Sequence, residues 1–287
     1  MRVVAILATY NEERFIEPCL ESLFEQGIQA YLVDNDSTDR TVAIASRYLG
    51  RGLLGVERFP RDGIYRWSSL LERKAQIAAT LDADWFMHVD ADEIYPSPRP
   101  GITLCEALAD IDAQGYNAVN FYQYTFVPTQ ESPDHEHPGF LETMKWYYPF
   151  IPTVPHLIRA WKRQPAPVDL AQSGGHRVHF AGLNLYPESL PMRHYHFLSL
   201  NHAIRKYVSK QYDPHEVGRG WHTWRATLRP DTIKLPSRAE LKTYTSDHEL
   251  DPSNPRASHC FVLAPGAGAS PWREWLRLLG SRLRKMV

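Results

Sequence analysis

The chain has 287 residues, of which 43% are hydrophobic and 23% are charged, and its formal net charge is −1. This composition is typical of a globular protein with ample material for a core, and the near-neutral balance argues against a nucleic-acid-binding surface. The three cysteines are scattered and form no CxxC pair, which argues against a disulfide framework or a zinc knuckle and favours a reducing, cytoplasmic compartment.

The first third of the chain alternates between short apolar runs and stretches with helical periodicity. In chain order the pattern predicts strand 3–8, helix 14–27, strand 30–36, helix 37–50, strand 53–59, helix 66–81 and strand 85–89. This alternation predicts an α/β fold with a mostly parallel sheet flanked by helices. No stretch approaches the roughly 20 apolar residues that span a bilayer, and the N-terminal run does not have the pattern of a signal peptide.

The pattern is less regular after residue 95. It predicts helix 103–115, strand 118–127, a Pro-rich irregular segment 128–155, strands 156–161 and 192–197, and helix 201–212. We find no internal repeat and no low-complexity segment in the chain.

Polar and charged residues follow four of the predicted strands, at Thr9–Glu12, Asp34–Asp39, Arg61–Asp62 and Asp90–Glu93. In open parallel sheets, ligands bind at the carboxyl ends of the strands. We therefore expect these four groups to form a site at one edge of the sheet. The loop TYNEE after the first strand lacks the glycines of a dinucleotide-binding loop or a P-loop, so NAD or FAD is not expected there.

Asp90 and Asp92 stand two positions apart at the end of the predicted strand 85–89. Two carboxylates in one small volume repel each other unless a cation compensates their charge. Oxygen ligands suit Mg²⁺ or Mn²⁺, which commonly binds one or two carboxylates together with substrate phosphates and water. A solvated turn with helix-capping acids is the alternative, but the position at a site-forming edge favours a divalent cofactor.

Three segments in the same order and spacing, ILATYNEERFIEPCLESL, YLVDNDSTDRTVAIA and WFMHVDADEI, resemble the nucleotide-binding half of a family-2 glycosyltransferase with the GT-A fold. The resemblance implies a single GT-A domain whose residues 1–127 bind the nucleotide sugar. We expect residues 128–250 to form a loop-rich acceptor-binding part of this domain and residues 251–287 to form a C-terminal extension.

The resemblance also implies roles for individual residues. Asp90 and Asp92 match the DxD motif, which holds the nucleotide diphosphate through a divalent metal. The positions implied to bind the nucleotide sugar are Thr9, Asn11, Glu12, Asp34, Arg73 and Asp90.

The activity implied by the resemblance is transfer of a sugar from a nucleotide-diphosphate sugar to a hydroxyl acceptor with inversion, with Mn²⁺ or Mg²⁺ as cofactor. The metal on Asp92 would neutralise the charge that develops on the leaving diphosphate. The acceptor would be a glycan or glycolipid, for example in bacterial surface-glycan or lipopolysaccharide synthesis. A catalytically silent nucleotide- or sugar-binding protein on the same scaffold is the alternative.

The general base is the most difficult assignment. Related enzymes often use an acid beyond the DxD strand, and here His176 of SGGHRVHF stands at a comparable distance. A histidine can take this role because its ordinary pKa is near 6.5. A structural or acceptor-contacting role for His176 is the alternative, and the rival bases are Asp134, Glu136, Glu142 and Glu93.

His194 and His196 lie two residues apart on the predicted strand 192–197, which places both on one face. Some GT-A enzymes recruit a late histidine to the DxD metal, so the predicted metal ligands are Asp92, Asp90 and His194. A hydrogen-bonded core histidine is the alternative for either side chain.

The C-terminal segment SPWREWLRLLGSRLRKMV has apolar residues at helical intervals and a local excess of arginine. This pattern predicts a basic amphipathic helix, which would lie on an anionic membrane surface at its inner face or dock on protein.

Overall fold

The computed structural model of the chain describes residues 1–262, and ten strands in this part form one mixed sheet. The strands are β1 (Val3–Thr9), β2 (Gln29–Asp34), β3 (Leu53–Arg58), β4 (Trp85–Val89), β5 (Glu93–Ile94), β6 (Ala118–Phe126), β7 (Trp146–Phe150), β8 (Leu157–Lys162), β9 (Leu190–Tyr195) and β10 (Lys242–Thr243).

The α-helices of the described part are α1 (Ile16–Glu25), α2 (Thr41–Ser46), α3 (Trp67–Thr80), α4 (Leu104–Ala113), α5 (Phe140–Thr143), α6 (Leu200–Ala203), α7 (Pro214–Gly218) and α8 (Thr223–Ala226). A π-helical turn, Ile204–Val208, continues α6, and three 3₁₀ turns lie at Pro230–Thr232, Arg238–Glu240 and Asp247–Glu249.

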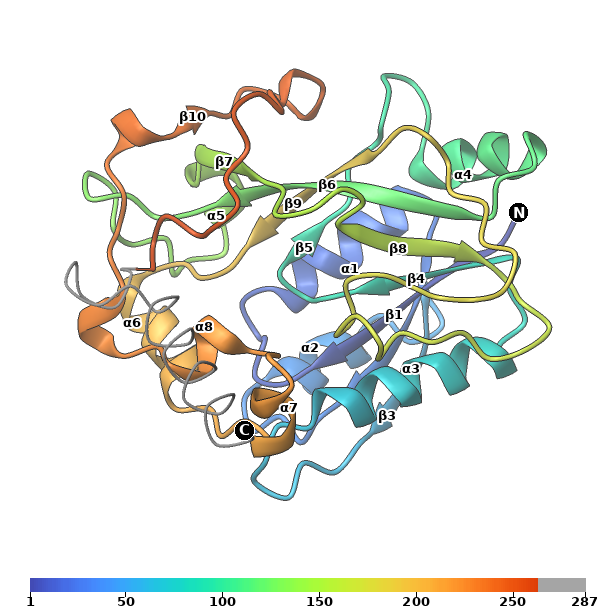
Figure 1. Ribbon diagram of the computed structural model, residues 1–287, viewed down its shortest axis with the longest axis horizontal. Helices are drawn as coiled ribbons and strands as arrows, with labels where there is room; N and C mark the ends of the chain where they lie inside the picture. Colours follow the sequence, from blue (N-terminus) through green and yellow to red (C-terminus); the bar gives the residue numbers. More distant parts are fainter. Residues whose placement is uncertain (263–287) are drawn as a thin grey trace, which may run out of the picture.

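The first half of the sheet is parallel throughout. Its strands follow the order β4-β1-β2-β3, with Leu7 opposite Val89 and Thr9 opposite Asp34. Connections that run through helices produce parallel neighbours, as the alternation in the sequence predicts. The register brings the carboxyl ends of β1, β2 and β4 to the same edge of the sheet (Figure 1).

The second half of the sheet contains antiparallel pairs. β8 lies antiparallel to β4 and to β6, β7 is antiparallel to β6, and β9 runs parallel to β6. The short strand β5 pairs with β9, so Glu93 lies opposite His194. This pairing brings the polar turn after β4 next to a strand that follows it by about a hundred residues.

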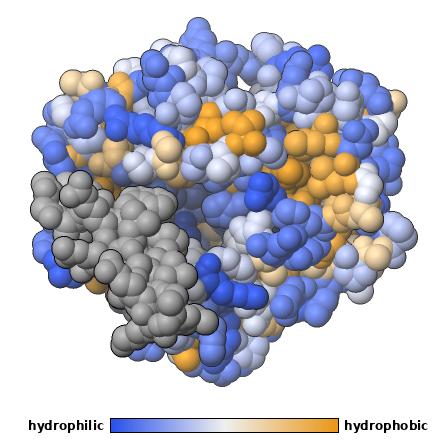
Figure 2. Space-filling model, in the orientation of Figure 1, coloured by the Kyte–Doolittle hydropathy of each residue, from blue (hydrophilic) through white to orange (hydrophobic). Residues whose placement is uncertain are grey.

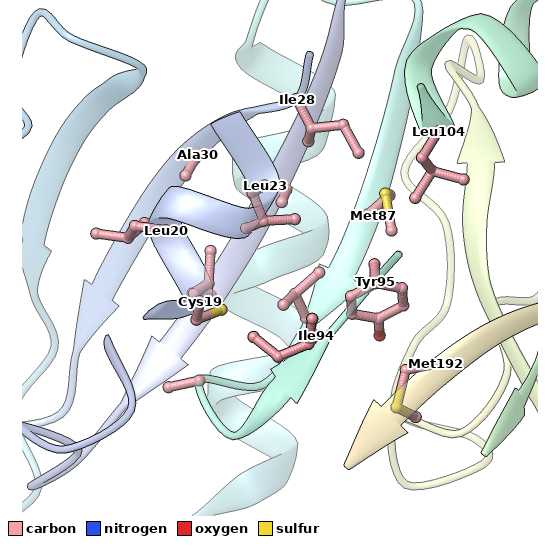
Figure 3. Packing of buried hydrophobic residues seen from close by; sticks show 14 of the residues in the cluster. Cys19, Leu20, Leu23, Ile28, Ala30, Met87, Ile94, Tyr95, Leu104 and Met192 are labelled. Carbon is pink, nitrogen blue, oxygen red and sulfur yellow. The ribbon is translucent and has the colours of Figure 1, made fainter. Parts of the chain in front are cut away.

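Helices cover both faces of the parallel half. Alternate residues of β1 point to opposite faces, so Ala5 and Leu7 pack with α1 and α4, whereas Val4 and Ile6 pack with α3. Figure 3 shows Cys19 and Leu23 of α1 directed towards Met87 of β4, with Tyr95 beyond them. A two-sided core of this kind explains the continuous apolar runs of the strands.

Two parts of the second half differ from the sequence-based prediction. The Pro-rich segment 128–155, predicted to be irregular, contains α5 and the strand β7. β7 includes Pro149, whose missing N–H masks the strand pattern. Helix 201–212 is shorter than predicted, because it ends with the π-helical turn at Val208.

The helices α6, α7 and α8 gather beyond the carboxyl-terminal edge of the parallel strands (Figure 1). A separate apolar cluster, which includes Tyr148, Phe197, Tyr207 and Phe261, holds this region together. On the face in Figure 2 most residues are hydrophilic, and apolar residues show in its upper centre and right. Among residues 1–262, no helix combines the length and apolar character that crossing a bilayer requires. The predicted C-terminal amphipathic helix lies outside the described residues.

Candidate functional site

The acidic turn after β4 is held by Glu93, which is 1% exposed. Its Oε2 atom accepts hydrogen bonds from the backbone N–H of Asp90 at 3.0 Å and from the hydroxyl of Tyr95 at 2.8 Å. Glu93 therefore fixes the shape of the turn from inside the core. This structural role accounts for Glu93, the third acid of the segment WFMHVDADEI.

Arg159 of β8 compensates the charge of this turn. Its Nη1 atom lies 3.1 Å from Asp90 Oδ2 and 3.2 Å from Glu93 Oε1. Burial alone would raise the pKa of Asp90, but the guanidinium of Arg159 and then the ammonium of Lys74 hold it below its ordinary value. Asp90 is thus an ionised carboxylate in a fixed position at the end of β4.

Asp92 lies against two histidines that β9 delivers. The pairing of β5 with β9, and a hydrogen bond from the N–H of Tyr195 to the carbonyl of Asp92, place His194 Nε2 3.3 Å from Asp92 Oδ2. The rings of His194 and His196 stack with their centroids 3.8 Å apart. One ligand atom each from Asp92, His194 and His196 lies within 4.8 Å of the others.

These three side chains fit a divalent cation. His194 Nδ1 and His196 Nε2 are buried, and neither has a hydrogen-bond partner among the described residues. One carboxylate and two imidazoles form a donor set that suits Mn²⁺ and other divalent transition metals. Asp90, a predicted metal ligand, is instead engaged with Arg159.

Lys206, in the π-helical turn, connects two acids of the site. Its Nζ atom lies 2.9 Å from Glu12 Oε2 and 2.9 Å from Asp92 Oδ2. The ammonium of Lys206, and then the contact with His194, hold the pKa of Asp92 well below its ordinary value, against the effect of burial. Burial raises the pKa of Glu12 to about 7, although the Lys206 ammonium favours its ionised form.

These groups line one cavity of about 430 Å³ at the carboxyl edge of β1 and β4. The structure brings six of the predicted site residues together around it: Thr9, Glu12, Asp90, Asp92, His176 and His194. Its other walls include the start of α3, the strand β8 with the loops before and after it, the segment 206–225 and His259.

Three predicted residues do not line this cavity. Asn11 has a φ of 57°. Its side chain supports the loop after β2 by accepting a hydrogen bond from the N–H of Thr38 at 2.7 Å. Asp34 is 5% exposed and accepts from the N–H of Ser37, whereas its neighbour Asn35 reaches the cavity.

Arg73 points towards β3, where it pairs with Glu57 at 2.6 Å. The adjacent Lys74 points beneath the end of β4. It is fully buried and does not line the cavity, and its Nζ atom lies 3.0 Å from both His88 Nδ1 and the carbonyl of Val89. The structure therefore does not place Arg73 at the cavity.

His176 enters the cavity on a glycine turn. Gly175 has a φ of 85°, and a Cβ atom there would come within 3.2 Å of His88 Nε2 and of the Trp67 ring, so only glycine fits. The ring of His176 faces His156 at 5.1 Å and has no hydrogen-bond partner among the described residues. Desolvation in the cavity, and then the charge of Arg159, lower the pKa of His176 below its ordinary value of 6.5.

The rival bases lie elsewhere. Glu93 is buried in the core beneath the turn, where burial raises its pKa. Glu136 pairs with Arg205 and accepts a hydrogen bond from Ser199. Asp134 and Glu142 are absent from the cavity lining in the described part of the chain. His176 is thus the only predicted base that reaches the cavity within residues 1–262.

Sequence reasoning missed most of the cationic residues of the site. Arg159 interrupts an otherwise apolar strand, and Lys206 and Lys210 stand four residues apart on a predicted helix. Both patterns are signals of a functional face, because a charged residue is rarely buried without a partner. The sequence did not indicate which acids they meet.

A family model described as "Glycosyl transferase family 2" matches residues 4–166, which is more than half of the chain. The chain belongs to glycosyl transferase family 2. The predicted family and α/β class, with a mostly parallel sheet flanked by helices, are confirmed for this family-2 glycosyltransferase. No curated protein matches the chain.

Solved structures similar to this family-2 glycosyltransferase include two of TarS from S. aureus. One, a fragment in complex with UDP, is 22% identical, covers 45% of this chain and 36% of that chain, and has a TM-score of 0.32. The other is 15% identical, covers 72% and 39% of the two chains, and has a TM-score of 0.42. An active-site mutant of LgtC is 11% identical, covers 44% and 46%, and has a TM-score of 0.28. The chain spans less than half the length of each of these three.

Proposed function

We propose that this family-2 glycosyltransferase is metal-dependent and transfers a sugar from a nucleotide-diphosphate sugar to a hydroxyl acceptor with inversion. The observation that carries the proposal is the cluster of Asp92, His194 and His196 at the carboxyl edge of the sheet. All three residues line the same cavity as Thr9, at the end of β1, and two of their imidazole nitrogens are buried with no hydrogen-bond partner among the described residues. Ligands bind at this edge in open α/β sheets.

Asp92, His194 and His196 would hold the cation. When bound, a divalent cation at this position neutralises negative charge on the leaving diphosphate. Asp90 is kept ionised and fixed by Arg159, so that it can accept hydrogen bonds from hydroxyl groups of the donor. Glu93 holds the backbone of the turn that carries both aspartates.

His176 is the proposed general base. The carboxylates that line the cavity in the described part of the chain are all paired, Asp90 with Arg159 and both Glu12 and Asp92 with Lys206. The lowered pKa keeps the ring of His176 neutral near pH 7, so a ring nitrogen can accept the proton of the attacking hydroxyl.

The test is a transfer assay with purified protein, Mn²⁺ or Mg²⁺, and a panel of UDP-, GDP-, ADP- and dTDP-sugars. Glycans and glycolipids of bacterial surfaces serve as acceptors, because we propose an acceptor of that class. We expect release of a nucleoside diphosphate from one donor, loss of turnover with EDTA, and at least a hundredfold loss in Asp92→Asn. NMR of the product reports whether the anomeric configuration is inverted.

Absence of turnover with every donor and metal would contradict the proposal. If one nucleotide sugar still binds, the protein is a catalytically silent binding protein. Full activity in EDTA, with Asp92→Asn inactive, would leave the transferase proposal in place and remove its metal dependence. The exposed His248→Gln variant is the control for nonspecific effects of substitution.

A further inference from the structure

Two cations that line the cavity, Lys210 and Arg225, have no ion-pair partner among residues 1–262. Lys210 follows the π-helical turn, and Arg225 lies in α8. The carboxylates nearby are already paired with Lys206 or Arg159. Cations in a partly desolvated position are costly without an anion, so their presence calls for a ligand.

Aromatic rings hold these cations in place. Lys210 lies 4.6 Å from the Tyr65 ring, and Arg225 lies 5.1 Å from the ring of Trp224. A cation–π contact stabilises the positive charge in part, but it does not provide hydrogen-bond acceptors for the N–H donors of the cation. The Nε atom of Arg225 is buried and has no hydrogen-bond partner in the described part of the chain.

The free protein holds these charges under mutual repulsion. Burial and the neighbouring cations lower the pKa of Lys210 to about 7, although the carboxylate of Glu12 opposes this shift. A bound anion would remove the repulsion and supply acceptors for the unused donors. Several cations around one cavity match an anion with more than one negative charge better than a single carboxylate.

The segment that carries Lys210 and Arg225 is fixed to the start of α3. The carboxylate of Glu216 in α7 accepts hydrogen bonds from the backbone N–H groups of Trp67 at 3.0 Å and Ser68 at 2.6 Å, at the start of α3. The N–H of Tyr65 donates to the carbonyl of Gln211 at 2.8 Å. The cations are therefore pre-positioned before any ligand arrives.

We propose that Lys210 and Arg225 form a diphosphate-binding wall, which takes the phosphate oxygens of the donor and retains them on the leaving group. This inference rests on the proposed function. As the bond between the sugar and the diphosphate oxygen breaks, its electron pair stays on that oxygen, and the acceptor hydroxyl supplies the new bond and loses its proton. The additional charge forms beside the wall, which lies outside the matched residues 4–166.

The experiment measures binding of inorganic pyrophosphate and orthophosphate to the full chain by calorimetry, without metal. We expect pyrophosphate to bind at least tenfold more tightly than orthophosphate, and Arg225→Gln and Lys210→Gln each to weaken it about tenfold. Arg225→Lys, which keeps the charge, should recover part of the affinity. Arg229→Gln is the matched control, because Arg229 is exposed and pairs with Asp231. Circular dichroism verifies that each variant is folded.

Unchanged pyrophosphate affinity in both Lys210→Gln and Arg225→Gln would overturn the proposal of a diphosphate-binding wall. So would a normal affinity for the nucleoside diphosphate together with a raised KM for the acceptor, because the cations would then hold an anionic acceptor. The two proposals fail separately. Normal sugar transfer by the glutamine variants refutes the wall alone, whereas absence of transfer by the wild-type protein refutes the proposed function whatever the pyrophosphate result.

Discussion

At the scale of single residues, each carboxylate that lines the cavity in the described part of the chain is paired with a cation. Arg159 has a side chain that is 7% exposed, and it serves the turn after β4 by facing Asp90 and Glu93 together. The two carboxylates raise its pKa further above the ordinary value, against the effect of burial. Removing one partner of a buried pair is costly, because the remaining charges stay in a medium that solvates them poorly.

Arg159→Met should therefore destabilise the protein by about 3 kcal/mol at pH 7. The two acids would then repel each other, so their pKa values would rise and the loss should shrink as the pH falls and they become protonated. Urea unfolding at several pH values from 7 to 4 measures this, and Arg159→Lys is the charge-keeping control. A loss that does not depend on pH would show that Arg159 acts through packing instead.

His176 gives a second prediction at this scale. Its pKa lies below 6.5, so the neutral base is present at and above neutral pH and is lost as the pH falls through its lowered pKa. On the acidic side, kcat, which reports groups of the enzyme–substrate complex, should decline only well below pH 6.5, towards the lowered pKa of about 4. His176→Gln should lower kcat about a hundredfold or more and remove this decline. An unchanged profile in His176→Gln would assign the base elsewhere.

At the scale of secondary-structure elements, α7 attaches the segment 206–225 to α3. The carboxylate of Glu216 occupies the place of an N-terminal cap for α3, although it lies 148 residues from Ser68 along the chain. The ring of His222, at 3.0 Å, contacts the same carboxylate. Burial alone would raise the pKa of Glu216, but hydrogen bonds from His222 and Ser68 lower it to about 2.

Because this folded-state pKa lies below the ordinary value of 4.5, Glu216 contributes stability that is complete above that pH and is lost as the pH falls towards 2. Glu216→Gln should lower the free energy of unfolding by about 2 kcal/mol at pH 7 and by much less at pH 3. Urea unfolding at both pH values is the measurement, with Glu25→Gln on the exposed side of α1 as control. A loss of equal size at pH 3 would contradict the charge-based cap.

The elements β1 to β4 could be predicted from the sequence because local signals determine them. Each is a buried apolar run that ends at polar residues, and a helical period follows each of the first three. Arg73 and Lys74 show the limit of such reasoning. A shift of one residue rotates a side chain by about 100° around a helix, so Arg73 pairs with Glu57 of β3 whereas Lys74 reaches the end of β4. The position of the segment 206–225 at the cavity could not be predicted, because Glu216 contacts α3 only in the folded chain.

At the scale of the whole molecule, Lys206 connects the two halves of the site. Glu12 follows β1, Asp92 follows β4, and the lysine that lies 2.9 Å from each belongs to the C-terminal part. Its ammonium contacts Asp92 Oδ2, the oxygen that His194 also faces. Lys206 therefore competes with a divalent cation for Asp92, and metal binding is coupled to the position of the segment after β9.

This competition predicts that Lys206→Gln changes the Tm in opposite ways, lowering it without metal and increasing its response to Mn²⁺. The variant should have a lower Tm than the wild-type protein without metal, because Glu12 and Asp92 lose their shared cation. With saturating Mn²⁺ its Tm should rise further than that of the wild-type protein, by about 4 °C if the metal binds about tenfold more tightly. Arg205→Gln, next to it but exposed and paired with Glu136, should respond as the wild-type protein does. A smaller Mn²⁺ response in Lys206→Gln would mean that the lysine supports the metal site instead of competing for Asp92, and that the coupling has the opposite sign.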